Sequence, residues 1–134
     1  MTTTDESNPY DEIPYQSVAL TETNIERIAA IARLFGLAPT PADSARVLEM
    51  GGAGGGNLLP MAAAFPGSTF VGIDLSARQI AQAKAAAEAA GVTNVEFHER
   101  SISDLAKADL GAFDYIVCHG VYSWVHAAVK GDIL

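Results

Sequence analysis

The chain has 134 residues, enough for one domain with a hydrophobic core. Hydrophobic residues make up 49% and charged residues 18% of it, which is typical of a globular protein and excludes a largely disordered one. The net charge is −8 and the basic residues are scattered, which argues against nucleic acid as a partner. The sequence has no long apolar run and no signal-like N-terminus, and this predicts a cytoplasmic protein without membrane contact.

The N-terminal part is expected to be an arm followed by a single domain. Residues 1–22 are polar, contain two prolines and show no sustained periodicity, so we assign them to the arm and residues 23–134 to the domain. Thr23 to Glu26 has the spacing of a capping box, and apolar residues then recur on one face. This pattern predicts an amphipathic helix that ends near Gly36 and packs on a sheet.

The most informative stretch runs from Arg46 to Asn57. A β-prone run there ends in the carboxylate of Glu49, and six small residues follow, five of them glycine. Glycines let a backbone turn tightly and approach a ligand before a helix begins, and we expect this turn to need a ligand to explain it. The next β-prone run ends in Asp74, placed as an acid that accepts hydrogen bonds from both hydroxyls of an adenosine ribose. The two features together predict a nucleoside cofactor.

Glu49 distinguishes between two nucleoside cofactors. A dinucleotide-binding loop receives a pyrophosphate, which a carboxylate at this position would repel. S-adenosylmethionine has no phosphate, and its methionine end carries an ammonium and a sulfonium, both stabilised by a nearby carboxylate. Glu49 therefore favours S-adenosylmethionine.

The rest of the chain alternates between strands and helices, with no internal repeat. An apolar run as continuous as residues 113–118 predicts a strand buried on both faces. Because each crossover between parallel strands must return right-handed, the alternation predicts an α/β fold with a doubly wound parallel sheet. After the glycine-rich turn we expect a short helix over 57–64 and a longer one that Ser76 caps and that runs to Ala90, with Gly91 as its stop. Strands are expected over 95–98 and 113–118, with a helical turn around 103–106 between them.

The order of these segments resembles class I S-adenosylmethionine-dependent methyltransferases. Residues 47–55, 71–76 and 113–117 resemble the first, second and fourth motifs of that family. More narrowly, residues 10–15 and 119–125 resemble bacterial methyltransferases that carry a C-terminal methyltransferase regulatory domain. The family has a Rossmann-like sheet of seven strands, so the resemblance implies a fold truncated after the fourth strand, with strand order 3-2-1-4.

The resemblance also implies roles for individual residues. The glycine-rich turn would pass beneath the methionine part of the cofactor, Asp74 would hold the ribose, and Leu75 would pack on the adenine. Ser101 stands where the family usually has an aspartate that meets the adenine amino group, and a serine accepts that bond more weakly. Tyr15, in the arm, could present its hydroxyl to the methionine carboxylate. The expected cofactor-binding residues are Tyr15, Glu49, Gly51, Gly52, Ala53, Gly55, Asn57, Asp74, Leu75, Ser101, Ile102 and His119.

His119 is the candidate catalytic residue, because it follows the fourth strand next to the expected methyl group. A neutral imidazole there could take a proton from a substrate or bond the cofactor's amino-acid end. A histidine that only orients the following loop is an equally open interpretation. His98 and His126 lack a partner spacing typical of metal ligands, and Cys118, the single cysteine, is expected to be a buried, inert thiol. No metal site is expected.

Three functions remain open at this stage. The first is the cofactor-binding portion of a methyltransferase that acts on an unidentified acceptor. An NAD(P)-dependent oxidoreductase domain is the second, since the spacing of Gly51, Ala53 and Gly56 with Asp74 also fits that fingerprint. A non-catalytic module that binds S-adenosylmethionine is the third. The fourth strand would be an unpaired edge, so we expect either a homodimer through it or a longer protein of which this chain is the N-terminal part.

Overall fold

The computed structural model describes residues 16–134, with the side chain of Ala106 excepted. Residues 1–15 lie outside the described part, and with them the predictions made for Tyr15 and for most of the N-terminal arm. Residues 16–22 are described, and they pack against the domain.

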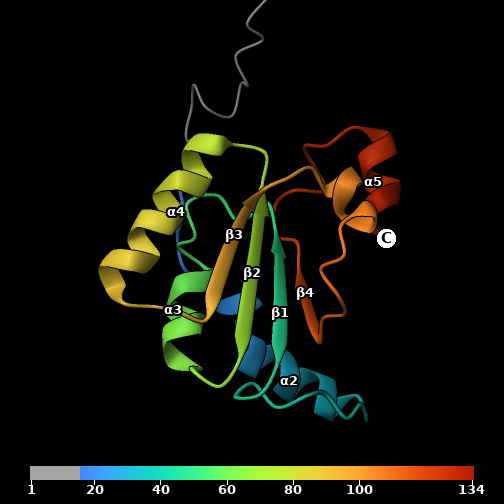
Figure 1. Cartoon of the computed structure of the whole chain (residues 1–134). Helices are drawn as coiled ribbons and strands as arrows, with labels where there is room; N and C mark the ends of the chain where they lie inside the picture. Colours follow the sequence, from blue (N-terminus) through green and yellow to red (C-terminus); the bar gives the residue numbers. More distant parts are fainter. Residues whose placement is uncertain (1–15) are drawn as a thin grey trace, which may run out of the picture.

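Four parallel strands form the centre of the molecule (Figure 1). They are β1 (Arg46–Met50), β2 (Thr69–Asp74), β3 (Val95–Glu99) and β4 (Tyr115–Val117), in the order β3-β2-β1-β4. Both the α/β doubly wound class and the 3-2-1-4 order predicted from the sequence are confirmed. The register places Glu49 between Gly72 of β2 and Val117 of β4, so the carboxyl ends of the central strands lie together.

One face of the sheet is covered by three helices. These are α2 (Ile25–Leu34), α3 (Leu58–Ala64) and α4 (Ala77–Ala90), and their apolar sides form the main core with alternate side chains of the strands. Ser76 caps α4 by accepting a hydrogen bond from the backbone N–H of Gln79, and Gly91 ends it in the left-handed conformation at φ 66°. Both ends of α4 are therefore as predicted.

The start of α2 differs from the prediction by one residue. The capping residue is Asn24, whose side chain accepts from the backbone N–H groups of Glu26 and Arg27 at 3.0 and 3.4 Å. The hydroxyl of Thr23 has other partners, because it donates to the carbonyl of Leu20 and accepts from the side chain of Asn57. Ordinary helix-capping rules could not anticipate this competing contact.

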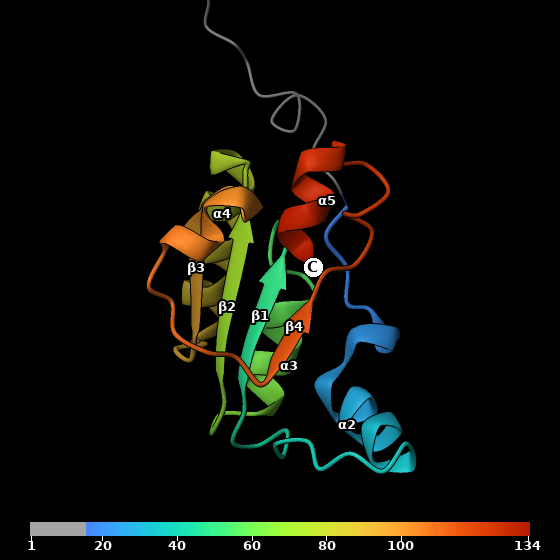
Figure 2. The same cartoon turned by 90° about the vertical axis from the view of Figure 1, so that its right-hand side faces the viewer.

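The second face is covered by the 3-10 helix η2 (Ile102–Lys107) and by α5 (Ala127–Ile133), a helix that the sequence pattern did not predict. Both lie toward the carboxyl ends of the strands (Figures 1 and 2). The strand over 113–118 was expected to be buried on both faces, and this was wrong. Tyr115 and Val117 are buried, but Ile116 faces the other side and is 60% exposed, because η2 and α5 do not extend over it.

At the opposite, amino end of the sheet, the side chains of Asp114 and Asn94 hydrogen-bond to neighbouring segments of the chain. Asp114 accepts from the hydroxyl of Thr40 and from the backbone N–H of Arg46, each at 2.7 Å. Asn94 donates to three backbone carbonyls, those of Ala62, Phe65 and Ser68.

Within residues 16–134, β4 has a sheet partner on one side only, and pairing of this edge with a second chain stays a prediction. No helix in the described residues is both long and apolar enough to pass through a bilayer.

Candidate functional site

The carboxyl ends of β1 and β2, which lie side by side in Figure 2, carry two acidic side chains, Glu49 and Asp74, and the glycine-rich turn follows β1. Ligands of doubly wound sheets bind at this end, where the chain order changes direction between neighbouring strands. Here the switch lies at β1, because β2 and β4 pair with its two edges. Glu49, Asp74 and the glycine-rich turn therefore lie at the end of the sheet where a ligand is expected.

The turn from Gly51 to Gly56 is held by the end of β2. The backbone N–H groups of Gly51 and Gly52 donate to the carbonyl of Ile73 at 2.8 and 3.3 Å. The N–H of Ala53 donates to a carboxylate oxygen of Asp74 at 2.9 Å. Ala53 has a φ of 47°, in the left-handed region that alanine rarely adopts, so this contact stabilises a strained residue.

Asp74 links the turn to the following helix. Its second carboxylate oxygen accepts from the backbone N–H of Ser76 at 2.9 Å, just before α4 begins. A carboxylate has about four lone-pair positions, and the two backbone N–H donors named here occupy two of them. Asp74 is half-buried and therefore still presents acceptor capacity to a ligand.

Contacts within the protein already account for the glycines of the turn. A Cβ on Gly56 would lie 2.4 Å from the backbone carbonyl oxygen of Ser17, and one on Gly51 would lie 2.4 Å from a methyl carbon of Val121. A Cβ on Gly55, whose φ is 80°, would come within 2.8 Å of the ring of Phe97. The expectation that this turn needs a ligand to explain its glycines was therefore wrong for these three, since neighbouring protein atoms exclude larger side chains there.

Glu49 is the most unusual side chain of the site. It is 4% exposed, and its Oε1 atom accepts a hydrogen bond from Nδ2 of Asn57 at 2.7 Å. Its Oε2 atom is buried and has no hydrogen-bond partner in the described residues. Burial raises the pKa of Glu49, the bond from Asn57 opposes that rise, and the charge of Asp74 adds to it. A buried carboxylate oxygen without a donor is costly, and a cationic donor would relieve that cost.

Residues 16–23, here called the N-terminal strap, lie against the end of the glycine-rich turn and hydrogen-bond to Gly56 and Asn57. The hydroxyl of Ser17 accepts from the backbone N–H of Gly56 at 2.6 Å. The backbone N–H of Leu20 donates to Oδ1 of Asn57, and Nδ2 of Asn57 donates to the hydroxyl of Thr23, both at 2.9 Å. Sequence reasoning missed this role of the strap because it rests on contacts between residues 34 to 39 positions apart.

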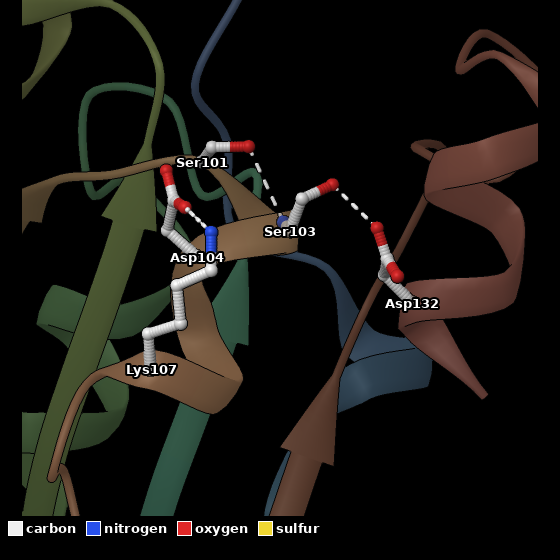
Figure 3. A network of polar contacts seen from close by, with 5 residues as sticks. All are labelled: Ser101, Ser103, Asp104, Lys107 and Asp132. Carbon is white, nitrogen blue, oxygen red and sulfur yellow. Dashed lines mark hydrogen bonds and ion pairs between the residues drawn. The ribbon is translucent and has the colours of Figure 1, made fainter.

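The adenine side of the expected site is an open cavity of about 550 Å³ between the end of β3 and η2. Ser101 caps η2 by accepting from the backbone N–H of Ser103, so one acceptor position of its hydroxyl is in use. Figure 3 shows how Ser103 in turn donates to Asp132 of α5 at 2.5 Å, which joins the two elements of this face. The cavity is lined by Leu75, Glu99, Arg100, Ser101, Asp104 and Lys107.

Ile102, His119 and Cys118 were also singled out in the sequence. Ile102 packs with the apolar cluster beneath η2 and is directed into the protein. His119 is exposed just beyond β4, two residues before Val121, which meets Gly51. Burial, reinforced by the charge of Glu49, raises the pKa of the Cys118 thiol, which favours its protonated, unreactive form. No group of three potential metal ligands gathers in the described residues.

A family model described as a methyltransferase domain matches residues 41–131, which include all four strands and both acidic strand ends. The chain belongs to this methyltransferase family. The resemblance to class I methyltransferases drawn from the sequence is thus confirmed, with its Rossmann-like fold. This family uses S-adenosylmethionine, which leaves the oxidoreductase alternative without support.

Individual relatives are larger than this methyltransferase domain. PKMT2 from Rickettsia typhi, solved in complex with AdoHcy, is 42% identical with a TM-score of 0.86, over 90% of this chain and 23% of that one. The N-terminal domain of EvdMO1, solved with SAH bound, is 29% identical with a TM-score of 0.62, over 84% of this chain and 45% of that one. An uncharacterized protein of Rickettsia prowazekii is 45% identical over 126 residues, which are 94% of this chain and 23% of the relative. The chain therefore spans about a quarter to a half of the length of these relatives.

Proposed function

We propose that this methyltransferase domain binds S-adenosylmethionine at the carboxyl ends of β1 and β2 and serves the transfer of its methyl group to an acceptor still to be identified. The observation that carries the proposal is the buried, unpartnered Oε2 atom of Glu49. A buried acceptor left unpaired costs about 1 to 3 kcal/mol, more when it is charged. The methionine ammonium is a donor of the right charge to remove that cost.

The other contacts of the cofactor follow from the geometry of the strand ends. Asp74 lies two residues beyond the position opposite Glu49 in the register, so the two carboxylates would take the ribose hydroxyls and the methionine ammonium separately. Leu75 is 49% exposed beside the cavity at η2 and would offer an apolar surface to the adenine. Ser101, at the entrance of η2, keeps its hydroxyl proton available to a ring nitrogen.

Methyl transfer requires little chemistry from the protein beyond alignment, exclusion of water and, for some acceptors, removal of a proton. The acceptor's lone pair forms the new bond to the methyl carbon while the sulfonium sulfur keeps the electrons of the bond that breaks. His119 is the residue that we propose for taking the acceptor's proton, because it is exposed at the end of β4 near the turn. The acceptor must enter from that side.

Calorimetric titration with S-adenosylhomocysteine, run beside NADH on the same preparation, tests the proposal. We expect saturable binding of S-adenosylhomocysteine and none of NADH. Asp74→Asn should weaken the binding about tenfold or more, since one acceptor oxygen becomes a donor. Asparagine is preferable to alanine because its amide oxygen can still accept from one of the two backbone N–H groups, of Ala53 and Ser76, that Asp74 holds, whereas alanine would lose both contacts. Saturation by NADH alone would overturn the proposal, and radiolabelled methyl transfer by this chain would exclude a non-catalytic module.

A further inference from the structure

We propose that Asn57 is a positioning residue, which turns Glu49 so that one carboxylate oxygen is occupied and the other is presented to the ligand. The inference rests on the proposed function, because it concerns how Glu49 meets the cofactor's ammonium. It also assigns a task to the N-terminal strap, which sets the orientation of Asn57. Asn57 was expected to bind the cofactor directly, and the proposal gives it an indirect role instead.

The hydrogen bonds of Asn57 are directed into the protein. The side chain is 6% exposed, and both N–H groups of its amide are donated, one to Glu49 and one to Thr23. Its carbonyl oxygen accepts from Leu20. Neither N–H group remains for a ligand, so an effect of Asn57 on binding must pass through a neighbour.

Glu49 is the neighbour through which Asn57 acts. With Oε1 held by Asn57 at 2.7 Å, Oε2 lies 2.7 Å from the point where a Cβ on Gly52 would stand. The free oxygen is therefore directly beneath the turn that would carry the methionine part of the cofactor. Without the bond from Asn57, both oxygens would lack a donor, and the carboxylate would lose its fixed rotation as well as support for its charged form.

The N-terminal strap determines which end of the Asn57 amide faces Glu49. The backbone N–H of Leu20 can only donate, so the amide oxygen must face Leu20 and the NH₂ group must face Glu49 and Thr23. A flipped amide would place two acceptors together at Glu49 and two donors together at Leu20. Docking of the strap is therefore coupled to the orientation of the ligand-facing carboxylate.

Two ligands that differ at the methionine end test this inference on the whole chain. S-adenosylhomocysteine carries the ammonium, whereas 5′-methylthioadenosine lacks the amino-acid part entirely. We expect Asn57→Leu to lower the affinity for S-adenosylhomocysteine about tenfold or more, and that for 5′-methylthioadenosine less than about twofold. In a Glu49→Gln background the same substitution should change neither affinity further, because the residue through which it acts is already neutral.

Asn94→Leu is the matched control. It removes a half-buried amide that also makes three hydrogen bonds, at the opposite end of the strands, so it should lower thermal stability and leave the ratio of the two affinities unchanged. If it changed that ratio as Asn57→Leu does, the ratio would report stability alone and the inference would fail. Should circular dichroism show that Asn57→Leu is unfolded, the smaller Asn57→Ser, which lacks the amide donors, must give the selective loss.

The outcomes separate the two proposals. Equal losses for both ligands, or an undiminished effect in the Glu49→Gln background, would overturn the positioning role and leave the proposed function standing. Absence of S-adenosylhomocysteine binding in the wild-type chain would overturn the proposed function, and the positioning role with it. A selective loss that disappears in the Glu49→Gln background supports both.

Discussion

The two ends of the parallel sheet contrast in how their polar groups are satisfied. At the amino end, Asp114 accepts from the hydroxyl of Thr40 and the backbone N–H of Arg46, and Asn94 donates to three backbone carbonyls. At the carboxyl end, Glu49 is buried with one oxygen unpaired, and Ala53 has a left-handed backbone. The named polar groups of the amino end are paired within the protein, whereas the carboxyl end retains a buried acceptor that, among the described residues, has no donor and that a cationic ligand would satisfy.

The two carboxylates show the difference in their pKa values. Bonds from Thr40 and from the backbone of Arg46 lower the pKa of Asp114, so its charge is favoured by folding. Burial raises the pKa of Glu49, so its charge is opposed by folding. The contrast indicates that substitutions at the two ends should change stability and ligand affinity in different combinations.

Gly55→Ala should have the largest effect. The new methyl group would stand 2.8 Å from the ring of Phe97 and 3.1 Å from Cβ of Ala83, at a φ of 80°. Left-handed strain of about 1 to 2 kcal/mol and overpacking of about 1 to 3 kcal/mol together predict a loss of about 2 to 5 kcal/mol in the free energy of unfolding. Urea denaturation measures it.

Gly91→Ala is the control for that substitution. Gly91 has a similar φ of 66°, but nothing lies within 4 Å of the position of its Cβ. We expect only the strain, about 1 to 2 kcal/mol, and no loss of ligand affinity. Equal destabilisation by the two substitutions would show that the turn is not closely packed on its neighbours.

Glu49→Gln should stabilise the unliganded chain and weaken its binding of S-adenosylhomocysteine. Removal of a buried, half-paired charge is expected to gain about 1 to 3 kcal/mol at pH 8, measured by thermal or urea denaturation. Because the folded-state pKa of Glu49 is raised, its contribution to stability is fully present below its unfolded pKa and is lost as the pH rises through the folded value. The stability difference between the two proteins should therefore shrink toward pH 4.

The same titration predicts how binding depends on pH. An ammonium favours the ionised carboxylate, so the affinity of the wild-type chain should rise as the pH passes upward through the raised pKa of Glu49. The Glu49→Gln variant should show a flat profile over this range. A variant profile parallel to that of the wild type would assign the pH dependence to another group.

Asp114→Asn should have the smallest effect, confined to stability. Its folded-state pKa is lowered, so the ionised carboxylate contributes stability above its unfolded pKa, and this is lost as the pH falls through the folded value. We expect a melting temperature a few degrees below that of the wild type at pH 7, converging with it near pH 3. Ligand affinity at pH 7 should stay the same, and a clear loss would contradict the separation of the two ends.

Local patterns in the sequence were sufficient for most of the fold. β-Prone and apolar runs predicted all four strands, and Ser76 and Gly91 marked both ends of α4, because caps and strand patterns depend on neighbouring residues. The strand order followed from the resemblance to the methyltransferase family. Long-range contacts decided the rest. The hydroxyl of Thr23 is bound by Asn57, which moved the cap of α2, and Ile116 of β4 is exposed because the elements of that face do not extend over it.

The sequence was sufficient to predict where the candidate site lies in the fold, but not which residues pack around its glycine-rich turn. Glu49 and Asp74 could be assigned from their positions at the ends of β-prone runs, and the structure puts them at the carboxyl ends of the neighbouring strands β1 and β2. The packing of Ser17 and Val121 around the glycines could not be foreseen, because both residues are remote in sequence from the turn. Whether each of the predicted residues contacts the cofactor stays a prediction.

The wide separation in sequence of the turn's neighbours has a consequence for synthesis and folding. Strands β1 and β2 can pair once residue 74 has been synthesised. The other edge of β1 pairs with β4, where Tyr115 lies opposite Val47, and the contact between Gly51 and Val121 forms only when residue 121 is present. Closing these longer loops costs additional entropy, so we expect the last part of the crevice to form late. A nascent chain would then expose Glu49 to water until β4 and Val121 have docked beside β1 and the turn.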